Sequence, residues 1–397
     1  MREIKKCLLV IPPTGNYLRE DRCQTPTWTM PRPPMILAQA AALMEAVGVE
    51  CAIRDYAAES KEWKDFRNDL QTFQPDLLFV NTTLPTLKKD VFSFKIAREI
   101  DEKVTTCIKG ADFYINAIEI MERCKDIDIA IQGEIDFVVQ EIIEQYPLLQ
   151  PVSGITFRAG KKIVQTSKRT YLEDLDSLPF PARHLLNNGI YLRPDTKTPL
   201  GVIQTARGCP AKCIFCAVEK VSGRKLRRRS VKNVILEIKE CFNKYNISDF
   251  FFNADTFTLD KKWVIQFCEE IVNQRLKIEW GCNSRVDSID REVASWMKKA
   301  GCWIVSLGVE SGNEEILKKT KKGITKQDVV EAVNVCKSEG LKSFLFLIIG
   351  LPWETKETAI ETIDFAKSLD CDFIEYNAAY PFPGTEYAEI LEKHNLF

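Results

Sequence analysis

The residues with the clearest chemical potential are three cysteines close together in the sequence, Cys209, Cys213 and Cys216. Their spacing is Cys-x3-Cys-x2-Cys, and Phe215 stands directly before the last of them. Cysteine thiolates hold iron–sulfur clusters, and closely spaced cysteines in one loop can wrap a single cluster. Three ligands for a four-iron cluster leave one iron open to a cofactor or substrate, which is how a catalytic metal site differs from a closed one. The triplet therefore predicts an open 4Fe–4S cluster.

Zinc is the alternative for this triplet. A structural zinc site takes four Cys or His ligands, usually in paired CxxC spacings. The chain has only two histidines, His184 and His394, and neither lies near the triplet. A distant cysteine such as Cys282 or Cys302 stays open as a fourth ligand. The other eleven of the 14 cysteines are scattered singly, often in apolar runs, which is typical of small buried hydrophobes.

The cysteine spacing, with an aromatic residue before the last cysteine, resembles the signature of the radical S-adenosylmethionine (SAM) superfamily. The resemblance implies that the methionyl amine and carboxylate of SAM chelate the open iron. An electron from the cluster then breaks the S–C5′ bond and releases a 5′-deoxyadenosyl radical, which abstracts hydrogen from an unreactive C–H bond. The resemblance also implies a partial (β/α)6 barrel with the triplet after its first strand.

The elements that must position the triplet agree with such a barrel. Short apolar runs alternate with helical-period segments from residue 199 to 397, and six β/α units fall short of a full eight-unit barrel. The expected strands are Gly201–Thr205, Asp249–Asn253, Lys277–Cys282, Trp303–Gly308, Ser343–Gly350 and Phe373–Ala378. The expected helices are Val231–Lys244, Lys261–Asn273, Arg291–Lys299, Lys326–Glu339 and Thr355–Leu369.

Several segments at the expected strand ends resemble the SAM-binding segments of the superfamily. The second strand ends at a position where members usually contact the SAM amino group, although an Ala-Asp pair stands where many have Gly-Glu. The fourth strand leads into a segment whose polar residues touch the ribose or amino group in members. The fifth leads into a Gly-Leu-Pro-x-Glu-Thr turn, which lies beneath the adenine. The candidate cofactor-binding residues are Asp255, Arg285, Glu310, Ser311, Gly350 and Glu354.

Each of these residues also has a plainer structural interpretation. Asp255 could cap the helix after Thr258, and Glu310 could be a surface carboxylate paired with Lys318 or Lys319.

The basic residues near the triplet allow two interpretations as well. Arg227, Arg229 and Lys322 could neutralise carboxylates of SAM or substrate, or they could form a solvated basic face.

Gly350 could be a turn residue that opens a helix, with Glu354 favourable in the first turn.

Residues 1–150 indicate a separate α/β domain. Five strands alternate with five helices, which predicts an open, doubly wound (Rossmann-like) parallel sheet with helices on both faces. Such a sheet binds ligands beyond the carboxyl ends of its strands. Residues 151–198 follow as a β-hairpin and an extended linker, and residues 199–397 form the barrel. The expected strands are Lys6–Ile11, Glu50–Arg54, Leu77–Asn81, Val104–Ile108 and Ile127–Ile131; the expected helices are Pro34–Val47, Lys61–Phe73, Leu87–Ile100, Tyr114–Cys124 and Asp136–Tyr146.

This order of sheet, linker and barrel resembles the cobalamin-binding class of radical SAM enzymes. The resemblance implies a corrin over the carboxyl ends of the sheet. No Asp-x-His-x-x-Gly segment is present, so no histidine is expected as the lower cobalt ligand. Lys109 and Phe113 flank a stretch where members have a small Gly-rich loop, and they would crowd a corrin unless they point away. The matching segments are Leu8–Pro13, Pro33–Ala38, Asp55 and Gln132–Glu134.

Composition narrows the partners and the compartment. Hydrophobic residues make up 45% and charged residues 28% of the 397 residues, and the formal net charge is −1, so no nucleic-acid partner is expected. No stretch approaches the length of a membrane span, and the first apolar run ends at Pro12 and Pro13, which predicts a cytoplasmic protein. Members of the class commonly carry a further C-terminal segment over the substrate, whereas only Glu386–Phe397 is expected after the sixth strand and its turn.

Three functions stay open. The first is a cobalamin-dependent methyltransferase, in which one SAM methylates cobalt and a second makes the radical on an unactivated carbon. The second is a radical SAM enzyme without a corrin, which performs cyclisation, C–C bond formation or rearrangement. The third is a non-catalytic iron–sulfur or binding protein. The resemblance implies an electron donor such as a flavodoxin or ferredoxin; the substrate, a small molecule or a lipid, is encoded by no segment.

Overall fold

The computed structural model describes residues 3–14, 18–19, 23–24, 31–110 and 113–395. The chain divides into two compact units, Met1–Leu200 and Gly201–Phe397. Each unit has its own hydrophobic core.

The first unit is built on a seven-stranded sheet in the order β4-β1-β5-β6-β7-β8-β9. The first five of these strands are parallel. From β1 the chain first adds β4 on one side and then β5, β6 and β7 on the other, so the topological switch point lies between β1 and β5. The parallel strands are β1 (Lys6–Ile11), β4 (Glu50–Asp55), β5 (Leu77–Asn81), β6 (Thr105–Lys109) and β7 (Ile129–Ile131). The predicted hairpin forms as β8 (Ile155–Ala159) and β9 (Lys162–Gln165), and it extends the sheet antiparallel to β7. A short pair, β2 (Leu18–Arg19) and β3 (Cys23–Gln24), stands apart from it.

Helices cover both faces of this sheet, as the alternating pattern predicts. Leu9 belongs to the core beneath α1 (Met35–Glu45) and α5 (Val138–Gln145). Leu8 belongs to the core on the other face, beneath α2 (Trp63–Phe73), α3 (Leu87–Ile100) and α4 (Phe113–Arg123). Neighbouring strand residues face opposite sides, so the strands are apolar on both faces and the sheet is buried between two helix layers.

The segment after the hairpin is ordered on the first unit. It contains three 3-10 turns, η2 (Leu175–Ser177), η3 (Arg183–Leu185) and η4 (Asn188–Ile190). The backbone N–H of Ala182 donates to Ala38 O at 2.9 Å, and the Tyr191 hydroxyl donates to Asp55 Oδ2 at 3.3 Å. Asp55, which the resemblance matched to a corrin-binding segment, is buried and thereby helps to hold the linker.

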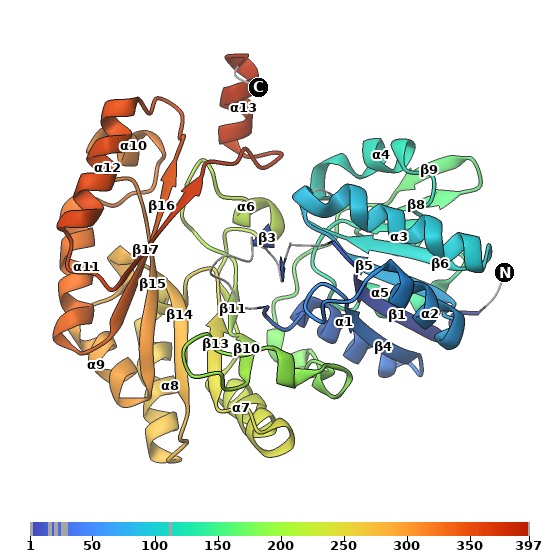
Figure 1. Ribbon diagram of the computed structural model, residues 1–397, viewed down its shortest axis with the longest axis horizontal. Helices are drawn as coiled ribbons and strands as arrows, with labels where there is room; N and C mark the ends of the chain where they lie inside the picture. Colours follow the sequence, from blue (N-terminus) through green and yellow to red (C-terminus); the bar gives the residue numbers. More distant parts are fainter. Residues whose placement is uncertain (1–2, 15–17, 20–22, 25–30, 111–112, 396–397) are drawn as a thin grey trace. The chain divides into compact units, whose positions relative to one another are not determined.

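The second unit is a six-stranded sheet whose spatial order repeats the sequence order, which confirms the partial (β/α)6 barrel. Its strands are β10 (Leu200–Gln204), β13 (Asp249–Asn253), β14 (Glu279–Arg285), β15 (Cys302–Glu310), β16 (Lys342–Ile349) and β17 (Phe373–Ala378). Because β13 to β17 pair in parallel, their carboxyl ends meet at one edge. The covering helices are α7 (Val231–Tyr245), α8 (Lys261–Asn273), α9 (Arg291–Lys299), α11 (Lys326–Ser338) and α12 (Lys356–Ser368), on the outer face of the strands (Figure 1).

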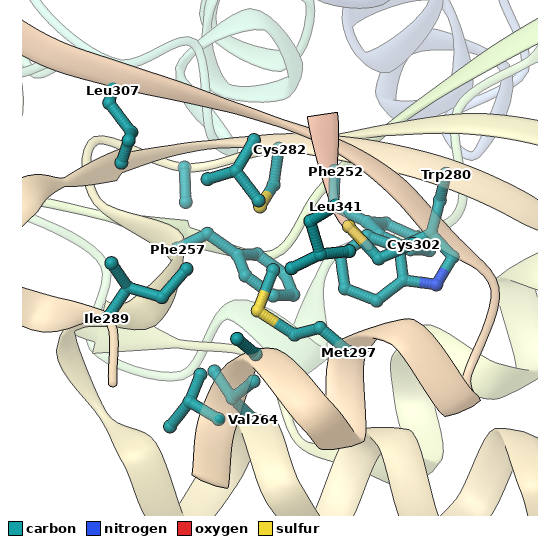
Figure 2. Close-up of a cluster of buried hydrophobic side chains, with 14 of the residues drawn as sticks. Phe252, Phe257, Val264, Trp280, Cys282, Ile289, Met297, Cys302, Leu307 and Leu341 are labelled. Atoms are coloured by element: carbon teal, nitrogen blue, oxygen red, sulfur yellow. The ribbon is translucent and has the colours of Figure 1, made fainter. Parts of the chain in front are cut away.

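Aromatic side chains fill the layer between the barrel strands and these helices. The rings of Phe252 and Trp280 lie 5.2 Å apart, and Phe257 packs 5.4 Å from Trp280. Cys282 and Cys302 lie in the same apolar cluster (Figure 2). The suggestion that one of them is a fourth zinc ligand is therefore wrong, because both are small buried hydrophobes.

Some elements were not expected from the sequence. Besides β2, β3 and the three turns of the linker, they are η1 (Leu84–Thr86), β11 (Ala206–Arg207), α6 (Val218–Val221), β12 (Arg227–Arg228), η5 (Phe257–Leu259), η6 (Val286–Ser288), α10 (Glu314–Lys319) and α13 (Glu386–Lys393). Two strands of the second unit also extend past their predicted carboxyl ends. As a result, Arg285 and Glu310 are the last residues of β14 and β15 rather than loop residues.

Candidate active site

The cysteine loop, residues 208–216, follows β10 and β11 at the carboxyl edge of the barrel. It begins at Gly208, whose φ of +87° favours glycine. A Cβ at this position would lie 2.1 Å from Lys225 O, so the loop packs on the backbone that leads into β12. The Cys209 N–H donates to Gly223 O at 3.2 Å on the same segment.

Three further elements hold the loop. The Gly208 N–H donates to Asp255 Oδ2 at 2.6 Å, just after β13. The Ile214 N–H donates to Thr320 O at 3.1 Å, after α10, and Ile214 O accepts from the Tyr387 N–H at 3.0 Å, in α13. The loop is therefore fixed by contacts distant in sequence as well as by its own turn.

The three thiols differ in their surroundings. Cys209 and Cys213 are half-buried, whereas Cys216 is exposed. Cys209 Sγ lies 3.8 Å from Thr256 Oγ1, and Cys213 Sγ lies 3.9 Å from Arg285 Nη1. Burial raises the pKa of the Cys213 thiol, while the charges of Lys322 and Arg285 act in the opposite direction.

The three thiols lie on one anchored loop, as a cluster with three cysteine ligands requires. Within the described residues, no three His, Cys, Asp or Glu side chains converge closely enough to hold one metal ion. Zinc needs its thiolates about 2.3 Å from one centre, whereas a four-iron cluster is larger and is bound by thiolates farther apart. Three thiols on one anchored loop, with cationic neighbours that favour thiolate, fit the predicted cluster.

Arg285 lies directly beside this loop. Its Nε and Nη2 donate to the two carboxylate oxygens of Asp287 at 2.9 and 2.7 Å, and Nη2 also donates to Lys322 O at 2.9 Å. The sequence placed Arg285 among the SAM-binding residues, and the structure shows that it contacts a candidate cluster ligand.

Glu310 forms a buried ion pair with Lys322, at 2.7 Å between Oε1 and Nζ. The two side chains are only 11% and 7% exposed, so the predicted surface pair with Lys318 or Lys319 is wrong. Glu310 has a φ of +70° at an irregularity of the β15–β16 pairing, and a Cβ on Gly308 would lie 2.6 Å from Glu310 Oε1. Burial opposes the Lys322 charge, but the carboxylate of Glu310 raises the pKa of Lys322.

The prediction of a solvated basic face is wrong for the residues named. Lys322 and Arg227 are buried, and Arg227 Nη2 donates to Ser222 O at 2.9 Å. Arg229 is 11% exposed and pairs with the buried Glu237 of α7. A sequence pattern gives the number of charges, whereas only packing decides which of them face water.

Asp255 does not cap the helix that follows it. Asp260 does so, because its side chain accepts from the Trp263 N–H at 3.2 Å. Asp255 accepts from the cysteine loop instead, as described above. Contact between Asp255 and SAM stays a prediction.

Ser311 is fully buried beneath α12. Its hydroxyl lies 3.1 Å from Thr362 Oγ1 and accepts from the Asn313 N–H at 3.2 Å. A Cβ on Gly312 would meet Thr362 Cα at 2.7 Å, so this turn is pressed onto the helix. The described contacts of Ser311 hold the turn, and its contact with SAM also stays a prediction.

The turn after β16 is closed by its own carboxylate. Glu354 Oε2 accepts from the Gly350 N–H at 2.5 Å, and the Tyr387 hydroxyl donates to Gly350 O at 3.1 Å. Glu354 Oε1 is buried and has no hydrogen-bond partner in the described part of the chain. Tyr387 was missed from the sequence, although Thr385 caps its helix and could have signalled α13.

The carboxyl edge of the first unit is also tightly built. A Cβ on Gly110, after β6, would lie 2.4 Å from Thr82 Cγ2, after β5. Thr82 and Thr86 both donate to the buried Asp90 carboxylate, at 2.6 and 2.7 Å. Phe113 is fully buried in the core beneath α4 and so points away from the edge; Ala111 and Asp112 lie outside the described residues.

Comparison with known proteins identifies the family. The family model described as the radical SAM superfamily matches residues 203–366. The chain is 32% identical to an uncharacterized methyltransferase of Pyrococcus horikoshii, over 99% of this chain and 84% of that protein. This chain belongs to the radical SAM superfamily. Membership implies a 4Fe–4S cluster and SAM, which the cysteine loop fits.

Two further comparisons extend over both units of this radical SAM protein. It is 27% identical to an anaerobic magnesium-protoporphyrin IX monomethyl ester cyclase of Cereibacter sphaeroides, over 87% of this chain and 57% of that protein. It also matches the structure of the radical SAM methyltransferase TsrM of Kitasatospora setae, which holds cobalamin and a 4Fe–4S cluster. That match has a TM-score of 0.78 and 19% identity, and covers 98% of this chain and 75% of TsrM, so it shows a shared fold. No helix in the described ranges is both long and apolar enough to cross a bilayer.

Proposed function

We propose that this radical SAM enzyme methylates an unactivated carbon with the help of cobalamin. The observation that carries the proposal is the presence, in one chain, of an anchored three-cysteine loop and a doubly wound unit with a built carboxyl edge. The methyltransferase names of the Pyrococcus relative and of TsrM support it. When bound, the cluster supplies the electron that cleaves SAM, and cobalamin supplies a carrier for the methyl group.

The residues of the first unit are compatible with a corrin. Phe113 and Lys109 were expected to crowd it unless they pointed away. Phe113 is buried in the core, whereas Lys109, the last residue of β6, is half-buried, and we propose that it points away from the corrin. Gly110 and Thr82 bring the loops after β6 and β5 into close contact, which leaves a compact edge at the switch point. Neither His184, which pairs with Glu45 at 3.0 Å, nor His394, beyond α13, belongs to these loops, so we propose binding without a histidine ligand.

In the second unit the proposed roles follow from the contacts. Cys209, Cys213 and Cys216 hold the cluster. Asp255 and Ser311 hold the turns on which the cluster and SAM depend. We propose that Arg285, Glu310, Gly350 and Glu354 bind SAM, because they lie at the same carboxyl edge of the barrel as the cysteine loop. Glu354 Oε1 is buried and accepts no hydrogen bond from the described residues, so we propose that SAM supplies its donor.

Cyclisation without methyl transfer is the second candidate. It is favoured by the similarity to the magnesium-protoporphyrin ester cyclase, which extends over 87% of this chain. Because the chain spans 57% of that cyclase, the substrate-binding parts of the two proteins need not correspond.

The experiment begins with anaerobic reconstitution with iron, sulfide and hydroxocobalamin, followed by desalting. About four irons and one cobalt per chain are expected. SAM and dithionite are then added with candidate substrates. Methylation predicts both S-adenosylhomocysteine and 5′-deoxyadenosine, because one SAM donates its methyl group and another is cleaved. Cobalt-free protein that forms 5′-deoxyadenosine alone would favour cyclisation. Absence of both products, as expected for the control Cys213→Ala, would leave a non-catalytic iron–sulfur protein.

We further propose a cytoplasmic enzyme that receives its electron from a flavodoxin or ferredoxin. The cysteine usage supports the compartment, since isolated thiols buried in apolar cores are typical of reducing surroundings. Cys216 is exposed, which supports delivery of the electron to the cluster by a donor protein on the side of this cysteine.

A further inference from the structure

The hydrogen-bond donors of Arg285 are almost fully committed. A guanidinium has five N–H groups in a rigid planar fork. Asp287 takes Nε and one N–H of Nη2, and Lys322 O takes the other N–H of Nη2. The side chain is 12% exposed. Nη1 is therefore held in place by the protein, and its described partner is Cys213 Sγ at 3.9 Å.

Each cation near Cys213 has a carboxylate partner. Arg285 donates to both oxygens of Asp287, and Lys322 pairs with Glu310 at 2.7 Å. Of these groups, Nη1 of Arg285 is the one that contacts the sulfur, at 3.9 Å. Hydrogen bonds to cluster sulfurs raise the reduction potential, because they stabilise the extra negative charge of the reduced state.

We propose that Arg285 is a positioning residue that raises the reduction potential of the cluster through an N–H···S hydrogen bond to Cys213. The inference rests on the proposed cluster, but on neither cobalamin nor methylation. Reduction adds one electron to the cluster, which dithionite supplies as it is oxidised. Arg285 lowers the driving force that this electron donor must provide.

The test is a redox titration of the reconstituted full-length protein without SAM, cobalamin or substrate, followed by the electron paramagnetic resonance signal of the reduced cluster. For Arg285→Met we expect a shift to more negative potential, with the reduced-to-oxidised ratio about tenfold lower at a fixed potential, which is about 59 mV for one electron. For Arg285→Lys we expect a shift in the same direction, because an ammonium cannot hold Asp287 and reach the sulfur at once. The matched control is Arg228→Met. The guanidinium of Arg228 lies 4.5 Å from the Trp263 ring and donates to Phe257 O, so the cluster potential of this variant should equal that of the wild type.

A wild-type potential in Arg285→Met with full iron content would overturn the proposal. Should that variant lose its iron, Arg285→Lys decides: a more negative potential supports the proposal, and an unchanged potential overturns it. An equal shift in Arg228→Met would also overturn it, since the effect would then come from the loss of any guanidinium in the barrel. None of these results depends on whether the enzyme methylates its substrate.

Discussion

At the scale of single residues, Asp255 shows how one carboxylate can hold the loop that carries the three cysteines. It accepts from the Gly208 N–H at the first residue of the cysteine loop. Position 208 must be a glycine, because a Cβ there would lie 2.1 Å from the Lys225 carbonyl oxygen. The hydrogen bond and the glycine together fix the position of the backbone at Cys209.

Asp255→Ala should therefore weaken the hold of the protein on its cluster. Loss of one charge-assisted hydrogen bond at a partly exposed site should release iron about tenfold faster. Iron transfer to a chelator under anaerobic conditions measures this rate. Asp260→Ala is the control, since it removes the cap of α8 and should lower stability without changing iron release. Wild-type release from Asp255→Ala would show that the loop does not depend on this contact.

At the scale of elements, the covering helices of the barrel each begin at a residue whose side chain caps the helix N-terminus. Asp290 accepts from the Val293 N–H at 3.0 Å and caps α9. Burial opposes its ionisation, but the Lys261 ammonium holds the pKa of Asp290 below its usual range. A carboxylate with a lowered folded pKa stabilises the protein above its unfolded pKa, and this stability is lost as the pH falls through the folded value.

Asp290→Ala should lower the free energy of unfolding by about 1 kcal/mol at pH 7. The cost should begin to shrink below about pH 5, where the unfolded aspartate begins to take up a proton, and should fall further as the pH drops through the lowered folded pKa. Chemical denaturation at several pH values measures both effects. Ser230→Ala, at the hydroxyl cap of α7, is the control, and its cost should not change with pH. A pH-independent cost for Asp290→Ala would contradict the role of its charge.

The loop after β6 offers a prediction about the first unit. Gly110→Ala places a Cβ against Thr82 Cγ2 and, at 2.8 Å, Thr82 O, so the edge loops must move apart. We expect several-fold less cobalamin to remain after desalting, as read from its visible absorption. Gly189→Ala, in η4 of the linker, is the matched control, because its added Cβ would meet its nearest heavy atom, Asn187 Oδ1, only at 3.7 Å. Equal retention in the two variants would mean that the corrin does not use the Gly110 edge.

At the scale of the whole molecule, the two units have separate hydrophobic cores. The barrel core contains Phe252, Phe267 and Trp280, and the two cores of the first unit contain residues of that unit alone. Separate cores allow one unit to lose stability while the other keeps it.

Phe267→Ala tests this independence. A large-to-small change in a packed aromatic cluster costs about 3–5 kcal/mol. Hydrogen exchange should therefore speed up in the amides of β13 and β14, while those of β1 and β5 keep their protection. Equal acceleration in β1 and β5 would show that the two units unfold as one.

The sequence by itself determined most of the elements and the nature of the chemistry. The period of apolar residues depends only on local geometry, so α8, α9 and both sheets follow directly from it. The spacing of Cys209, Cys213 and Cys216 is likewise local, because one loop supplies all three thiols. Short pieces such as α6, α10 and β12 were missed, since segments of four, six and two residues are too short to show a period.

Only the tertiary structure decided which polar groups meet. Arg285 and Cys213 are 72 residues apart, and Glu310 pairs with Lys322 because a bulge and a glycine make room for it. Each of these contacts joins residues on separate strands or loops. Several residues near each partner in the sequence carry the same charge as that partner, so the sequence alone does not show which of them makes the contact. Charge patterns therefore suggested a solvated face, whereas packing at the strand edge buried Arg227 and Lys322 beside the cysteine loop. Chemistry could be predicted from local spacing, but the surroundings that tune it depend on distances that only the folded chain defines.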